Sequence, residues 1–105
     1  MSERFTRVAS LAELPPGTLG RAEAGGRRIL LANVDGEILA TDEICTHEDA
    51  SLYRGALHGD CVSCPLHGSR FNLRTGEPLE EPATEPLRTY EVEVRDGDIL
   101  VRVDT

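Results

Sequence analysis

Two short segments, each with one cysteine and one histidine, constrain this 105-residue chain more than any other feature. The first is Cys45-Thr46-His47, and the second is Cys64-Pro65-Leu66-His67, which begins after a gap of sixteen residues. Thiolate and imidazole are ligands that soft and borderline metals prefer. Zinc would take all four side chains in one tetrahedron. A [2Fe–2S] cluster would bind both cysteines on one iron and both histidines on the other. The spacing leaves both metals open.

Glycine-containing dipeptides outside these segments predict β-hairpins. Gly25-Gly26, Asp35-Gly36 and Asp96-Gly97 favour the positive φ angles that two-residue hairpin turns require. The strands expected around these turns and elsewhere cover residues 4–8, 18–24, 27–34, 37–42, 61–63, 87–95 and 99–103. Many short strands with regular turn signals indicate an all-β fold, either an antiparallel sandwich or a small barrel.

The remaining segments are expected to be irregular or very short. Residues 43–58 show neither the helical nor the strand period, so we expect a long loop that carries the first ligand pair. Residues 76–86 are rich in proline and glutamate and should also be irregular. Ser10 and Glu13 have the spacing of a capping box, which predicts a single helical turn.

Length and charge limit the classes of protein to which the chain can belong. We expect one domain over residues 1–105, because domains typically span about 100–150 residues. The net charge of −8 argues against binding to nucleic acid and favours a partner with a basic docking patch. The longest apolar run, Ile29–Ala32, is too short to cross a membrane, and the N-terminus has no apolar signal region. We therefore expect a cytoplasmic protein whose three cysteines are metal ligands plus one spare thiol.

The two ligand segments resemble the cluster-binding loops of Rieske-type ferredoxins. The similarity continues through Gly59–Cys64 and Phe71–Glu77, which resemble the small soluble ferredoxins of bacterial ring-hydroxylating dioxygenase systems. The resemblance implies a Rieske-type sandwich or barrel in which two loops, at about 43–58 and 64–72, form a cluster-binding subdomain. It also implies one [2Fe–2S] cluster per chain, with the ligands Cys45, His47, Cys64 and His67.

Several departures from the high-potential Rieske proteins bear on the expected reduction potential. The two positions of their loop-to-loop disulfide are Ala50 and Leu66 here, and Phe71 replaces a tyrosine that donates to a cysteine sulfur. Ser69 retains a hydroxyl that bonds a bridging sulfide in that group and could raise the potential modestly. We expect a potential near the low end of the Rieske range, on the order of −150 mV. By the same resemblance, Pro82 and Pro86 are candidates for a loop that covers the cluster.

The resemblance implies an electron carrier rather than an enzyme. The chain would pass one electron at a time from a flavin-dependent ferredoxin reductase to the terminal oxygenase of an aromatic ring-hydroxylating dioxygenase system. Two of its three histidines are already assigned, so a separate mononuclear iron site is not expected, and there is no nucleotide-binding glycine motif. Ferredoxins of diiron aromatic monooxygenases and small subunits of assimilatory nitrite reductases share this fold and remain alternatives.

A zinc-stabilised module without a redox role is the other alternative. Cys61 and Cys64 have C-x-x-C spacing, so zinc could bind Cys45, His47, Cys61 and Cys64. Against this, Cys61 lies in a strand pattern at a position where relatives of the resembled family carry a small apolar residue. We expect a buried free thiol there and a solvated His58.

Overall fold

The computed structural model describes residues 5–46, 50–66, 68–79 and 85–103. The described residues are mostly strands, which confirms the all-β prediction. The strands are β1 (Phe5–Ser10), β2 (Leu19–Ala24), β3 (Arg27–Val34), β4 (Glu37–Asp42), β5 (Ala56–His58), β6 (Cys61–Ser63), β7 (Arg70–Asn72), β8 (Thr89–Arg95) and β9 (Asp98–Arg102). Two single turns of 3-10 helix, η1 (Leu11–Glu13) and η2 (Leu52–Arg54), complete the regular structure.

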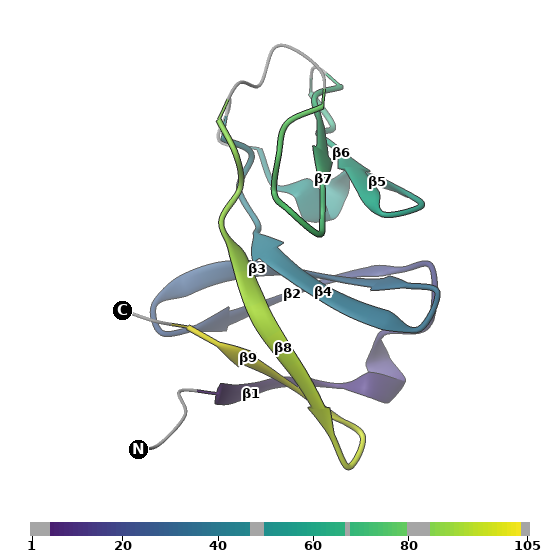
Figure 1. The fold of residues 1–105 in the computed structure, drawn as a ribbon, viewed down its shortest axis with the longest axis vertical. Helices are drawn as coiled ribbons and strands as arrows, with labels where there is room; N and C mark the ends of the chain where they lie inside the picture. Colours follow the sequence, from purple (N-terminus) through teal and green to yellow (C-terminus); the bar gives the residue numbers. More distant parts are fainter. Residues whose placement is uncertain (1–4, 47–49, 67, 80–84, 104–105) are drawn as a thin grey trace.

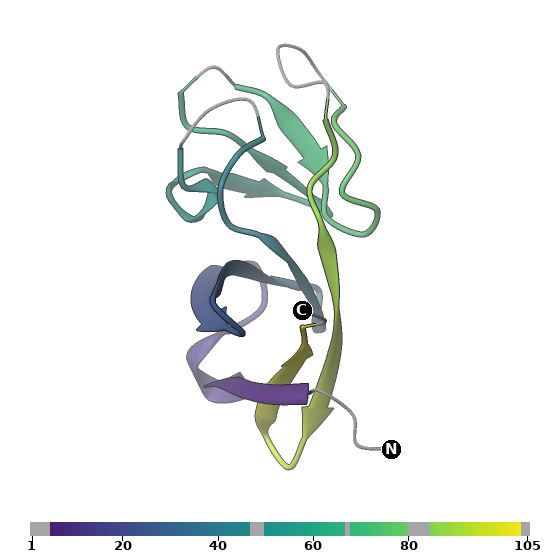
Figure 2. The same ribbon diagram turned by 90° about the vertical axis from the view of Figure 1, so that its left-hand side faces the viewer.

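The strands form a large and a small antiparallel sheet. The large sheet has the order β1-β9-β8-β4-β3-β2, and its two edge strands approach each other, so that it curls into a nearly closed barrel. The small sheet has the order β5-β6-β7. The small sheet lies at one end of the long axis, and the β8–β9 hairpin lies at the opposite end (Figure 1). The chain enters the small sheet after β4 and returns to the barrel at β8 (Figures 1 and 2).

The predicted hairpins and the predicted helical turn are confirmed. Asp35 and Asp96 have φ angles of 53° and 52°, and each is followed by a glycine that also has positive φ, as two-residue hairpin turns require. The Ser10 hydroxyl accepts a hydrogen bond from the Ala12 amide at 3.3 Å, and the Ser10 amide donates to the Glu13 carboxylate at 3.1 Å. The capping box therefore forms as expected.

The expectation of a continuous loop over residues 43–58 is wrong, because this segment contains η2 and β5. The third strand of the small sheet, β7, was also not expected. Each strand of this sheet has three residues, too few to show an alternating pattern. They are held by pairing with each other: Ala56 pairs with Ser63, and Cys61 pairs with Asn72. Tertiary pairing, not local propensity, thus forms the small sheet.

Strand β3 lies between two apolar cores and contributes side chains to both. Its side chains Leu30, Ala32 and Val34 belong to a cluster that we call the loop core. Ile29 and Leu31, which point to the other face, belong to the barrel core. Successive side chains of a strand alternate between faces, so the longest apolar run of the sequence marks a strand that is buried on both sides.

A glycine permits close contact between η2 and the small sheet. Gly55 follows η2 and has an ordinary φ of −86°, so it is not required for its backbone angle. A Cβ atom at this position would lie 1.9 Å from the Ser63 carbonyl oxygen. Only glycine fits without a backbone shift.

We expect Gly55→Ala to lower the free energy of unfolding by roughly 3 kcal/mol, because the new methyl group overlaps backbone atoms. Thermal and urea unfolding followed by circular dichroism would measure the loss. Gly97→Ala is the control, because its Cβ would meet open space and only its φ of 81° is unfavourable, for about 1–2 kcal/mol. Equal losses for the two variants would contradict this account.

A second contact joins β4 to β8 where the chain passes between the barrel and the small sheet. The Tyr90 hydroxyl donates to Asp42 Oδ1 at 2.5 Å, and the Asp42 amide donates to the Arg88 carbonyl at 2.9 Å. Partial burial of the phenol, together with the bonded and negatively charged Asp42, raises the pKa of Tyr90 to about 12.

Tyr90→Phe should therefore lower the free energy of unfolding by about 1–2 kcal/mol at neutral pH. The raised pKa in the folded state favours the neutral phenol, so the wild-type protein should lose this contribution as the pH rises from about 10 to about 12. Urea unfolding between pH 7 and pH 12 should show a shallower decline for the variant. Tyr53→Phe, at an exposed ring, should not change stability at neutral pH. An unchanged pH dependence in Tyr90→Phe would refute the assignment.

Candidate metal centre

The first ligand loop leaves the end of β4 and is closed at its base. The Cys45 amide donates to the Ala50 carbonyl at 2.9 Å, and Ile44 forms an antiparallel bridge with Ser51. The Cys45 side chain is 4% exposed. The backbone on both sides of residues 45–50 is therefore fixed, and the sulfur is directed into the protein.

The second ligand loop leaves β6 and makes a tight turn. The Cys64 amide donates to the Ser69 carbonyl at 2.7 Å, and the Gly68 amide donates to the Cys64 carbonyl at 3.2 Å. Gly68 has a φ of 75°, a conformation that glycine adopts without strain. Cys64 is 4% exposed.

The two loops bring Cys45 and Cys64 into one apolar environment. Both side chains belong to the loop core, together with Leu52, Val62 and Phe71. Two thiol ligands from separate loops, shielded from water on one side, suit an iron that carries two thiolates. The predicted ligands His47 and His67 lie outside the described residues. Within the described ranges, no group of three or more His, Cys, Asp or Glu side chains could hold a metal ion.

A third segment contacts the first loop. The Thr46 hydroxyl donates to the Glu85 carbonyl at 2.8 Å, across 39 positions of sequence. Pro86, a predicted covering residue, follows directly and is exposed, while Pro82 lies outside the described residues. Nothing in the sequence indicated a role for Thr46, although it lies between two predicted ligands.

Cys61 is placed differently from the other two cysteines. It is only partly buried, so the expectation of a buried thiol is wrong. Alternation along β6 puts it on the face opposite the fully buried Val62, and it does not belong to the loop core. Its sulfur lies 3.5 Å from Asp60 Oδ1, and burial together with this carboxylate raises the pKa of the thiol. Its place outside the loop core, which contains Cys45 and Cys64, does not favour the zinc set.

The positions that distinguish high-potential Rieske proteins also have defined surroundings. Phe71 is fully buried and offers no hydroxyl to a neighbouring sulfur. Ala50 is buried, Leu66 is 60% exposed, and no disulfide joins the three cysteines, all of which the structure describes. Ser69 is 1% exposed.

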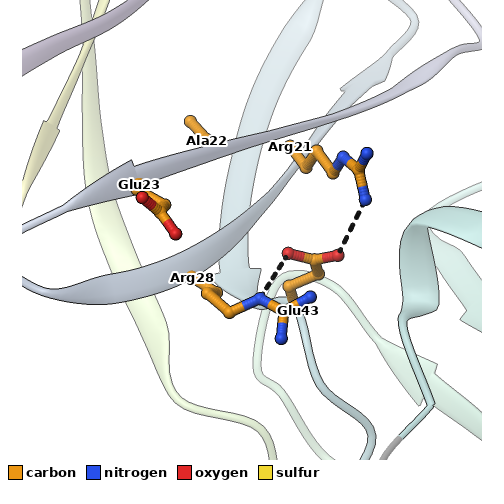
Figure 3. Close-up of a pocket in the computed structure, with 5 residues that line it drawn as sticks. All are labelled: Arg21, Ala22, Glu23, Arg28 and Glu43. Atoms are coloured by element: carbon orange, nitrogen blue, oxygen red, sulfur yellow. Dashed lines mark ion pairs between the residues drawn. The ribbon is translucent and has the colours of Figure 1, made fainter.

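A buried carboxylate beside the first loop was not predicted. Glu43 lines a surface hollow of about 520 Å³ together with Arg21, Ala22, Glu23 and Arg28 (Figure 3). Arg28 Nε lies 3.4 Å from Glu43 Oε1, and Arg21 Nη1 lies 3.9 Å from Glu43 Oε2. Nothing in the sequence distinguishes Glu43 from its acidic neighbours, because burial of a charged residue depends on partners distant in the chain.

Comparison with known proteins supports the predicted family. The Rieske [2Fe-2S] domain matches residues 4–91. The chain is 38% identical over 102 residues to the ferredoxin CarAc of Metapseudomonas resinovorans, covering 96% of this chain and 95% of that protein. It is 44% identical over 104 residues to the 3-phenylpropionate/cinnamic acid dioxygenase ferredoxin subunit of Photorhabdus laumondii, covering 98% of this chain and 96% of that protein.

Solved structures agree with the sequence comparison. A complex of reduced oxygenase and oxidized ferredoxin in carbazole 1,9a-dioxygenase contains a chain with 37% identity and a TM-score of 0.88, covering 96% of this chain and 94% of that chain. A nitrite reductase small subunit has 26% identity and a TM-score of 0.80, covering 94% of this chain and 98% of that chain. The family match includes both ligand segments and most of the chain, and we conclude that this protein belongs to the Rieske [2Fe-2S] domain family.

Proposed function

We propose that this protein is the ferredoxin of an aromatic ring-hydroxylating dioxygenase system. It carries single electrons from a flavin-dependent ferredoxin reductase to a terminal oxygenase and is not itself an enzyme. The observation that carries this proposal is the match, over nearly the full length of both chains, to ferredoxin components of dioxygenase systems. The related ferredoxin that has been solved with its oxygenase identifies the class of partner.

The cofactor in this proposal is one Rieske-type [2Fe–2S] cluster, with Cys45 and Cys64 on one iron and His47 and His67 on the other. When bound, the cluster supplies reversible one-electron chemistry at a potential above that of plant-type ferredoxins. The protein contributes the loop core, which keeps water from the cysteine side. Backbone hydrogen bonds within both loops hold the two sulfurs in place. The whole chain, residues 1–105, acts as a single domain around this centre.

The end of the molecule that carries the small sheet is the proposed docking end. Leu66 follows Cys64 by two residues and is 60% exposed. Exposed apolar side chains beside a redox centre favour close, dry contact with a partner. The β8–β9 hairpin lies at the other end of the long axis and is too distant to take part (Figure 1).

The location in the cell is also a proposal. No helix among the described residues is long and apolar enough to span a membrane. Reduced cysteines and a partner class that includes a flavin-dependent reductase are compatible with the cytoplasm.

Replacing each cysteine by serine tests the ligand set. We expect the wild-type protein to contain two irons and two sulfides per chain, and Cys61→Ser to retain them, because Cys61 lies outside the loop core. Cys45→Ser and Cys64→Ser should lose the cluster and its visible absorbance. Metal and sulfide analysis after aerobic purification gives the answer. The same experiment with histidine uses His58→Ala as the control for His47→Ala and His67→Ala.

A colourless wild-type protein that holds one zinc per chain and loses it in Cys61→Ser would overturn the proposal. So would a protein that remains colourless after anaerobic reconstitution with iron and sulfide.

Leu66→Ser should weaken docking without loss of the cluster. We expect the ferredoxin concentration that half-saturates a dioxygenase terminal oxygenase to rise about tenfold, equivalent to about 1.4 kcal/mol. Val94→Ser, at a residue that is 44% exposed near the β8–β9 hairpin, is the matched control and should not change it. Steady-state turnover with a reductase and an oxygenase measures the half-saturating concentration of both variants. An equal rise in the half-saturating concentration for Leu66→Ser and Val94→Ser would show that the oxygenase does not dock at Leu66.

A nitrite reductase partner is the second candidate, favoured by the 26% identical small subunit. Parallel assays with a dioxygenase and with a nitrite reductase large subunit distinguish the two systems. Electron delivery to the nitrite reductase alone would replace the proposed partner while leaving the cluster assignment intact.

A further inference from the structure

Glu43 is the one charged side chain among the described residues that is buried. It is 2% exposed and precedes Cys45 by two residues. A buried carboxylate is costly unless charged and hydrogen-bonding partners surround it. The contacts of Glu43 therefore show which parts of the fold this buried charge holds together beside the first ligand loop.

Glu43 makes contacts on both sides of the loop base. Its carbonyl accepts from the Leu52 amide at 2.8 Å, and its carboxylate accepts a hydrogen bond from the Ser51 hydroxyl. The same hydroxyl accepts from the Tyr53 amide at 3.3 Å and so caps η2. Ser51 is also the residue that bridges to Ile44. The segments that enter and leave the first loop are thus joined by backbone hydrogen bonds and by the side-chain hydrogen bond between Ser51 and Glu43.

Glu43 also anchors the loop base to the barrel. Its amide donates to the Arg28 carbonyl at 3.1 Å, and its carboxylate faces the guanidinium groups of Arg28 on β3 and Arg21 on β2 (Figure 3). The Arg21 guanidinium lies 5.0 Å from the centre of the Tyr53 ring, at η2. Two strands of the barrel sheet and the helical turn after the loop therefore meet at this carboxylate.

We propose that Glu43 and Ser51 are positioning residues for the cluster: their hydrogen bond fixes the base of the first loop and thereby the place of Cys45. The inference rests on the ligand set proposed above. Cys45 is held within the same short ladder, through its amide and the Ala50 carbonyl. Because Glu43 precedes Cys45 by only two residues, a shift of the backbone at Glu43 would also move the Cys45 sulfur.

A positioning role predicts effects on the cluster that exceed the effect on folding. Groups that orient metal ligands typically change metal affinity by about 10- to 100-fold when they are removed. Ser51→Ala should therefore accelerate cluster loss to a chelator by about tenfold or more at a temperature well below unfolding. Glu43→Gln, which keeps the size but removes the charge, should act in the same direction.

The chain offers a matched control in Ser10. Ser10 also caps a single turn of 3-10 helix, η1, by accepting a hydrogen bond from a backbone amide. Ser10→Ala should lower the unfolding temperature by a few degrees, as loss of a cap does, without accelerating cluster loss. Ser51→Thr keeps the hydroxyl and should restore the wild-type rate.

The experiment uses the cluster-loaded protein and two readouts. The first is the rate at which visible absorbance bleaches in the presence of a chelator. The second is the visible circular dichroism of the oxidised protein and the electron paramagnetic resonance spectrum of the reduced protein, both of which report cluster geometry. We expect both to change in Ser51→Ala and Glu43→Gln. The effect of the double variant should be smaller than the sum of the two single effects, because both substitutions weaken the contact that Glu43 and Ser51 share.

Unaltered bleaching rates and spectra in Ser51→Ala, with a loss of thermal stability similar to that of Ser10→Ala, would overturn the inference and leave an ordinary helix cap. Fully additive effects in the double variant would also overturn it. Failure of the proposed function is a separate result, because the wild-type protein would then lack the [2Fe–2S] absorbance before any substitution is made. If Glu43→Gln does not fold, Ser51→Ala and its rescue by Ser51→Thr decide the question.

Discussion

The burial of β3 on both faces is the constraint on which the rest of the structure depends. One face closes the barrel core, and the other forms the floor of the loop core that contains Cys45 and Cys64. The small sheet has strands of only three residues and could not form a core by itself. It is ordered because it packs on a strand that the barrel already fixes. The end of the molecule that carries the two predicted ligand loops therefore depends on the barrel, although no predicted ligand lies in a barrel strand.

Three polar contacts transmit this support across the junction between the barrel and the loops. Asp42 ties the end of β4 to the start of β8, Glu43 ties the base of the first loop to β2 and β3, and Thr46 ties the loop itself to Glu85. The three residues lie within positions 42–46, so the short stretch from the end of β4 past Cys45 is fixed at successive points.

Much of the barrel and the family of the chain could be predicted from the sequence. Dipeptides such as Asp35-Gly36 form hairpin turns through their own backbone preferences, which are readable from the sequence. The continuous apolar run of β3 likewise indicates a buried strand before its packing neighbours are known. The small sheet could not be predicted, because β5 and β7 exist only through pairing with β6. The exposure of Cys61 and the burial of Glu43 were missed for the same reason: both depend on residues distant in the chain. The ligand histidines remain predictions.

The pairing of β1 with β9 has a consequence for how the protein is made. The ion pair between Arg7 and Asp98 spans 91 positions, so the barrel cannot close until the last strand has left the ribosome. Both cysteine-containing loops are synthesised before β8 and β9. The hairpins β2–β3–β4 and β5–β6–β7, by contrast, involve neighbouring segments and can form early. Every residue of the loop core, Cys45 and Cys64 included, precedes β8, so this core has been synthesised in full before the barrel can close.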